Sequence, residues 1–113
     1  MKVNVDASFD VDEGIGRTRV IVRDFHGKFV VASCLCLPYV SEAMAAEAYA
    51  LREGFTRTKW TGLKSCIMQS DNMQLIETMS GGGILTFSDV AILFDCTLLA
   101  TSFAMIKYEN CNT

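Results

Sequence analysis

The sequence predicts an α/β domain in which helices flank a mixed five-stranded sheet. Three observations support this fold class. The first 37 residues contain three segments of alternating polarity, residues 43–60 form a strongly helix-prone run, and strand and helix patterns then alternate to the end. The predicted order is three strands, a helix, a strand, two helices and a strand (β-β-β-α-β-α-α-β). At 113 residues, half of them hydrophobic, the chain is long enough for one domain with a sizeable core.

The first three strands are predicted to form an antiparallel meander. Residues 2–9 alternate, so Val3 and Val5 face one way while Asn4 and Asp6 face the other. Residues 10–16 are rich in acids and glycine and indicate a turn or loop. Residues 17–24 and 29–37 predict the second and third strands, and the short segment between them, which contains Gly27, indicates a hairpin.

The long helix is predicted to begin near Ala43 and to end near Trp60, because alanine and leucine are frequent and β-branched residues are absent from its first half. Ser41 is the expected N-cap, and Gly62 the expected C-terminal stop. A stripe of apolar residues at helical spacing predicts the buried face: Met44, Ala48, Leu51 and Phe55. Glu47 lies beside that stripe, where a carboxylate is costly unless a charged group meets it.

The remaining elements are shorter. Residues 64–70 predict a fourth strand, and residues 73–79 a short helix capped by Asp71 or Asn72. Residues 81–83 are glycines, which break this helix and predict a flexible hinge. Ser88 is the expected cap of a further helix over residues 91–99, and residues 102–109 predict the fifth strand.

Composition restricts the classes of function only weakly. The net charge of −3 argues against a broad basic surface, although acids gathered in a metal site also lower the net charge. Five cysteines, an odd number, favour a reducing intracellular compartment, nucleus or cytoplasm, with the thiols mostly acting as small core residues. Cys34 and Cys36 lack the further ligands that a zinc site needs. No apolar run is long enough to predict a membrane span.

Three acids stand out by position. Asp6 lies near the end of the first strand, Glu47 in the long helix, and Asp71 directly after the fourth strand. Each alone is more often structural, as a turn, a solvated residue or a cap. If the first and fourth strands are neighbours, however, the three carboxylates meet. Two carboxylates at about 4 Å repel by roughly 4 kcal/mol at an effective dielectric constant near 20. Such a trio therefore predicts a hard-cation site suited to Mg²⁺ or Mn²⁺.

Four segments, taken in order, resemble the successive motifs of the ribonuclease H-like domains abundant in plants, which are related to the ribonuclease H region of reverse transcriptases. The segments are Val3 to Phe9, Val22 to Gly27, Ala46 to Gly54 and Gln69 to Asn72. The resemblance extends over nearly the whole chain, residues 1–113, as one domain. It implies the ribonuclease H-like fold, which agrees with the predicted order of elements.

The resemblance also implies an activity. Members of this family hydrolyse the RNA strand of an RNA–DNA hybrid with two divalent metal ions, which would be Mg²⁺ or Mn²⁺. Asp6, Glu47 and Asp71 match the acidic positions of the family and would be the catalytic residues and metal ligands. Ser8 and Asn72 would contact the sugar or phosphate of the hybrid. Recognition of 2′-hydroxyls along an A-like duplex implies selection by shape rather than by base sequence.

The chain also departs from the family pattern. A fourth acid normally lies in a final helix after the fifth strand, and this chain stops at Thr113, so the domain is expected to be incomplete at its C-terminus, without that helix. Part of the sheet or of the helix over residues 91–99 should therefore expose apolar surface. Arg17 and Arg19 replace small residues, and we expect Arg19 to be a solvated edge residue rather than a phosphate contact.

Two alternatives follow. The first is a catalytically weak or inactive ribonuclease H-like domain that acts in nucleic-acid or protein binding. The second is a 3′–5′ exonuclease of the same superfamily, although the segment around Glu47 does not resemble the corresponding exonuclease motif.

Overall fold

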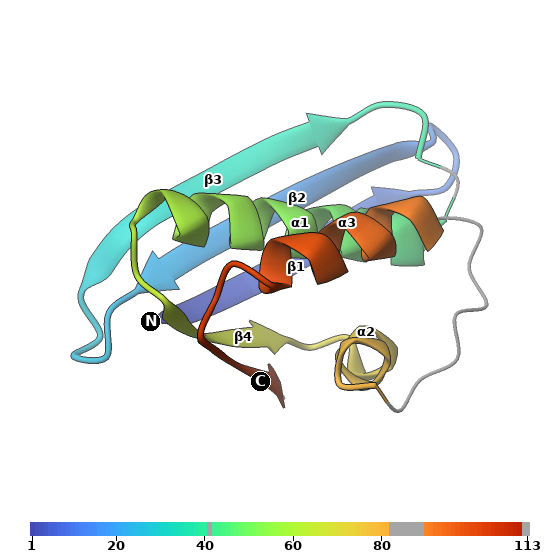
Figure 1. Ribbon diagram of the computed structural model, residues 1–113. Helices are drawn as coiled ribbons and strands as arrows, with labels where there is room; N and C mark the ends of the chain where they lie inside the picture. The colour runs from blue at the N-terminus through green and yellow to red at the C-terminus, as the bar shows by residue number, and fades with distance from the viewer. Residues whose placement is uncertain (41, 82–89, 112–113) are drawn as a thin grey trace.

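The computed structural model describes residues 1–40, 42–81 and 90–111, and its elements follow the predicted order (Figure 1). The strands are β1 (Lys2–Asp10), β2 (Ile15–Arg23), β3 (Phe29–Leu37), β4 (Ser65–Ser70) and β5 (Met105–Asn110). The helices are α1 (Ala43–Trp60), α2 (Met73–Met79) and α3 (Val90–Ala100). Within the described ranges, no helix combines the length and the apolar character needed to cross a membrane.

The five strands form one mixed sheet with the order β3-β2-β1-β4-β5. β1 pairs antiparallel with β2 and β2 with β3, which confirms the predicted meander. β4 joins the other side of β1 in parallel, and β5 pairs parallel with β4. A parallel neighbour requires a crossover connection, and α1 supplies it between β3 and β4. The first and fourth strands are therefore neighbours, which is the condition on which the predicted acidic site depends.

The core lies between the sheet and α1. Val3 and Val5 of β1 and Val20 and Val22 of β2 are at most 3% exposed and line the face that α1 covers. Phe55 of α1 is fully buried in the same cluster. Each such side chain contributes about 1.5–3 kcal/mol when it is fully buried. The alternation in the sequence thus places Val3 and Val5 on the face of β1 that forms the core. Asp6 lies on the other face of the strand, outside the core.

Gly54 allows α1 to approach β1 closely. A Cβ atom at this position would lie 2.7 Å from Cγ1 of Val5 and 3.3 Å from Cγ1 of Val3. Alanine favours a helix by about 1 kcal/mol over glycine, but overpacking of a core costs about 1–3 kcal/mol. We expect Gly54→Ala to lower the free energy of unfolding by about 1–2 kcal/mol, measured by urea denaturation. Lys59→Ala, at an exposed position of α1, is the control, and a stabilised Gly54→Ala protein would contradict this view of the packing.

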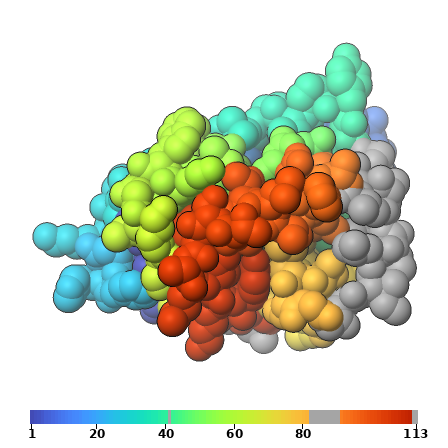
Figure 2. Space-filling model, in the orientation of Figure 1, coloured from blue at the N-terminus to red at the C-terminus, as the bar shows by residue number. Residues whose placement is uncertain are grey.

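α3 packs against α1 on the same side of the sheet, as Figures 1 and 2 show. Leu93 and Cys96 are buried in the core, and an ion pair of 3.3 Å joins Asp95 to Arg52 of α1. The side chains of Phe94 and Leu98 are 61% and 54% exposed. This agrees with the apolar surface predicted for the helix.

The ends of several elements differ from the prediction. β2 begins two residues earlier than expected, at Ile15, and β5 begins three residues later, at Met105. Glu42, rather than Ser41, occupies the N-cap position of α1. Ser41 itself lies outside the described residues, as do Gly82, Gly83 and Ser88. Asn72 caps α2, because its side chain accepts a hydrogen bond of 2.9 Å from the amide of Leu75.

Four of the five cysteines fall into two groups, and the fifth, Cys111, is partly buried. Cys66 and Cys96 are buried, as predicted, and burial raises the pKa of Cys66 to about 11 and that of Cys96 to about 12. Cys34 and Cys36 are exposed, so the prediction of a core role was wrong for them. The reason is topological: β3 is an edge strand, and these alternate residues lie on the face opposite α1.

Candidate active site

The site lies where β1 and β4 stop pairing. The ladder between the two parallel strands ends at Asn4 and Gln69, and two residues further along each chain come Asp6 and Asp71. Ligand sites of open sheets gather at the carboxyl ends of parallel strands, where side chains leave the core without being lost to bulk water. Asp6 and Asp71 therefore lie close together, just beyond the end of the β1–β4 ladder.

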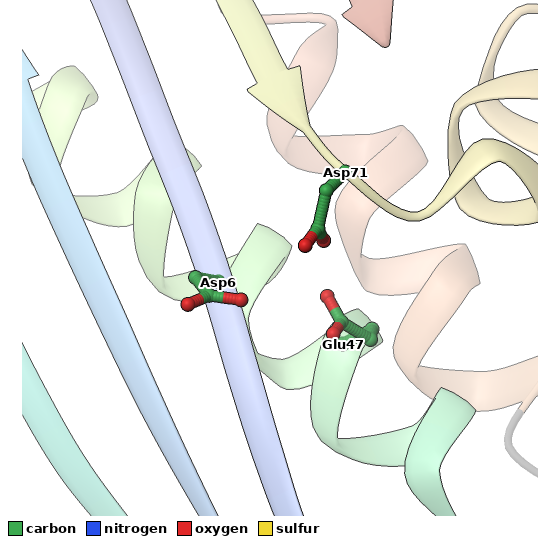
Figure 3. Close-up of side chains that lie close together, drawn as sticks. All are labelled: Asp6, Glu47 and Asp71. Atoms are coloured by element: carbon green, nitrogen blue, oxygen red, sulfur yellow. The ribbon is translucent and has the colours of Figure 1, made fainter. Parts of the chain in front are cut away.

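Glu47 reaches the same place from α1 (Figure 3). Its neighbours Ala46 and Ala48 are 0% and 1% exposed, so this part of the helix is held tightly against the core. Glu47 itself is 8% exposed, and its Oε2 atom has no hydrogen-bond partner among the described residues. A buried carboxylate oxygen without a partner is costly and calls for a proton or a cation.

The structure brings the three predicted acids together. One carboxylate oxygen from each of Asp6, Glu47 and Asp71 lies within 4.8 Å of the other two. In Figure 3 the carboxylates of Asp71 and Glu47 point toward one another, with that of Asp6 beside them. The three groups come from β1, from α1 and from the residue after β4, so none of them is placed by its sequence neighbours alone.

The electrostatics of the cluster act mainly on Glu47. Burial raises its pKa to about 7, and the charges of Asp71 and then Asp6 add to this effect, while the nearby amide of Ala7 opposes it. Near neutral pH the Glu47 carboxyl therefore exchanges readily between its neutral and charged forms. A bound cation would favour the charged form.

This donor set fits a hard divalent cation. Carboxylate oxygens are the ligands that Mg²⁺, Ca²⁺ and Mn²⁺ prefer, and no thiol or imidazole belongs to the cluster found among the described residues. The unpartnered Oε2 of Glu47 is the strongest sign of fit, because a cation at this point would satisfy it.

Asp6 is held by two further contacts. Its Oδ1 atom accepts a hydrogen bond of 2.9 Å from the amide of Ala7, and its Oδ2 atom lies 3.2 Å from Nη2 of Arg19. The expectation that Arg19 is a solvated edge residue was wrong in part. Its side chain is 63% exposed, but β2 is an internal strand, and Arg19 lies directly opposite Asp6 in the ladder. The register of the hairpin is the signal that predicts this pair.

The two expected substrate contacts lie in different settings. Ser8 is exposed on β1, two residues beyond Asp6, and lines the same groove as Asp6 and Arg19. Asn72 has a structural task, the capping of α2. Sequence reasoning missed Ser70, which is 1% exposed and accepts a hydrogen bond of 3.1 Å from the amide of Asn72 through Oγ. This contact fixes the turn that carries Asp71.

The sheet face that bears Asp6 also carries exposed cations. The cross-strand pairs place the following residues on this face: Lys2, Arg17, Arg19, Arg23 and Lys107. The net charge of the chain is −3, yet five of its ten lysines and arginines lie on this one face of the sheet. The net charge of the chain therefore did not predict the charge of this face. Strand pairing brings basic residues that are far apart in the sequence onto the same face of the sheet.

A sheet of order β3-β2-β1-β4-β5, with an acidic cluster at the end of β1 and β4, defines a ribonuclease H-like fold. The sequence model of the reverse transcriptase-like family matches residues 4–112, and the chain belongs to this family. Among curated protein sequences, none matches the chain significantly.

Solved structures share the fold at low identity. The N-terminal RNase H domain of a Mycobacterium tuberculosis protein is 20% identical, with a TM-score of 0.89, and the match covers 100% of this chain and 88% of that one. RNase H1 from Halobacterium salinarum is 14% identical, with a TM-score of 0.88 and coverages of 96% and 82%. LC11-RNase H1 in complex with an RNA/DNA hybrid is 12% identical, with a TM-score of 0.86 and coverages of 96% and 82%.

Proposed function

We propose that this chain hydrolyses the RNA strand of RNA–DNA hybrids, with Asp6, Glu47 and Asp71 as catalytic residues that hold two Mg²⁺ or Mn²⁺ ions. The observation that carries the proposal is the convergence of the three carboxylates around a buried, unpartnered oxygen of Glu47. Held by these three carboxylates, two divalent ions would supply the positive charge that activates a water molecule and stabilises the departing oxygen in phosphodiester hydrolysis.

Each acid has a distinct position for this task. Glu47 lies on a buried segment of α1, which fixes the position of its backbone. The amide of Ala7 and the guanidinium of Arg19 orient the carboxylate of Asp6. Asp71 is exposed, so its carboxylate is accessible to a polynucleotide. Preorganised ligands of this kind lower the cost of assembling the reacting groups.

The substrate class is supported by charge and by relatives. The exposed cations on the face of Asp6 suit a phosphate backbone, which supplies most of the affinity of nucleic-acid binding. We assign Ser8 and Asn72 to sugar or phosphate contacts, which position the strand without reading its sequence. The structure of LC11-RNase H1 is a complex with an RNA/DNA hybrid. The four sequence motifs favour the plant-type branch of the family, and the free thiols suit a reducing intracellular compartment.

The direct test is hydrolysis of an end-labelled RNA–DNA hybrid in Mg²⁺ or Mn²⁺. We expect cleavage within the RNA strand, no cleavage of a DNA duplex of the same sequence, and loss of activity in EDTA. Asp6→Asn should remove the activity, because it removes a metal ligand. Cleavage by Asp6→Asn at the wild-type rate would contradict the proposed site.

A second candidate is a binding domain with little or no catalysis. It is favoured by the composition of the cluster, which contains three acids among the described residues, one of them paired with an arginine. In that case the hybrid would bind, as a gel-shift assay would show, while no RNA cleavage would occur at millimolar Mg²⁺ or Mn²⁺.

A further inference from the structure

Arg19 contacts the acidic site directly. Its Nη2 atom lies 3.2 Å from Oδ2 of Asp6, and the other oxygen of Asp6 accepts the hydrogen bond from Ala7. Both oxygens of this carboxylate are therefore engaged. Asp6 and Arg19 also line two neighbouring hollows of about 210 and 490 Å³, the first shared with Asp71 and the second extending over β2 and β3.

A guanidinium and a divalent cation compete for the same oxygen. An exposed ion pair such as this one, with side chains 63% and 48% exposed, is weak, so a metal ion displaces it without large cost. The displaced guanidinium nevertheless stays on the neighbouring strand, where its positive charge repels the ion. Both effects weaken metal binding, and both depend on the direct cross-strand position of Arg19 opposite Asp6.

We propose that Arg19 is a displaceable counterion that sets the divalent-cation affinity of the site. The inference rests on the proposed function, because it takes Asp6 as a metal ligand. In the absence of the cation, Arg19 neutralises part of the negative charge of the cluster. When the cation binds, the guanidinium leaves Oδ2 and faces the hollow over β2 and β3, where it is free to meet a phosphate group.

Arg17 provides a matched control. It lies on the same strand and the same face, two residues from Arg19, or about 7 Å along the strand. Its charge is the same, and it forms no ion pair with a described residue, so Arg17→Gln changes the net charge equally without touching Asp6.

The experiment is isothermal titration calorimetry of MgCl₂ into the wild-type chain, Arg19→Gln and Arg17→Gln at low ionic strength, with circular dichroism to verify folding. We expect the dissociation constant of Mg²⁺ to fall about three- to tenfold in Arg19→Gln. We expect it to stay within about twofold of wild type in Arg17→Gln, because Arg17 does not compete for Oδ2 of Asp6 and its charge lies further from the site. The Ala7 amide signal in a ¹H–¹⁵N spectrum reports occupancy at Asp6 independently of heat.

The outcomes separate the two proposals. Equal affinity in all three proteins, or weaker binding in Arg19→Gln, overturns the role of Arg19 and leaves the metal site standing. Absence of Mg²⁺ binding in all three proteins overturns the metal site and the role of Arg19 together. Tighter binding in both variants alike also overturns the inference, because it reports net charge rather than the contact with Asp6.

Discussion

Asp71→Asn is expected to reduce hydrolysis of an RNA–DNA hybrid by about a hundredfold or more, since the loss of a preorganised charged group at a reacting centre costs several kcal/mol. The substitution keeps the size of the side chain and removes the charge. Asp71 is exposed and lies outside the core, so the fold should be retained. The measurement is the rate of RNA cleavage with the chain in excess over the hybrid.

Asp12→Asn is the control for this experiment. Asp12 is an exposed acid in the turn between β1 and β2, and it does not belong to the acidic cluster. Its substitution changes the net charge by the same amount and should leave the rate within about twofold. If Asp71→Asn were as active as Asp12→Asn, the cluster would not be the active site.

Glu47→Gln is expected to stabilise the metal-free chain at alkaline pH. The pKa of Glu47 is raised from 4.5 to about 7, so the native state binds more protons than the unfolded state between these values. The free energy of unfolding should therefore fall as the pH rises through this window, by up to about 3 kcal/mol. Glutamine, which does not ionise, avoids the loss, so the variant should exceed wild type at pH 8 and match it near pH 4.

Urea denaturation in EDTA at pH 4, 6 and 8 measures this difference. Glu77→Gln, at an exposed position of α2, reports the general effect of removing one carboxylate. Addition of Mg²⁺ at pH 8 should recover stability in wild type and less in Glu47→Gln, because the ion replaces the missing proton. A wild-type chain that gains stability steadily from pH 4 to 8 in EDTA would contradict the burial of a charged Glu47.

Most of the fold was predictable because its signals are local. Alternation identified β1, β2 and β3, and the alanine-rich run identified α1 with its bounds correct. The site was predictable once β1 and β4 were assumed to be neighbours, since that adjacency alone brings Asp6 and Asp71 together. The burial of Glu47 followed from its position beside an apolar stripe.

What the sequence did not reveal depends on register and topology. The pairing of Arg19 with Asp6 requires the hairpin register, which is set by the length of the turn between β1 and β2. The exposure of Cys34 and Cys36 requires knowing that β3 is the edge of the sheet. Ser41 was a reasonable cap by residue type, but the helix begins at Ala43, so Glu42 occupies the N-cap position.

The large sequence separation of the three acids also affects the order in which the fold forms. Residues 6, 47 and 71 are distant in sequence, so closing the loops between them costs chain entropy before any contact repays it. Contacts of this range form late and slow the folding of small domains. The site is thus complete only when α1 and β4 have packed against the meander of β1, β2 and β3. A cation that needs all three carboxylates would therefore bind the complete sheet and would not bind the meander alone.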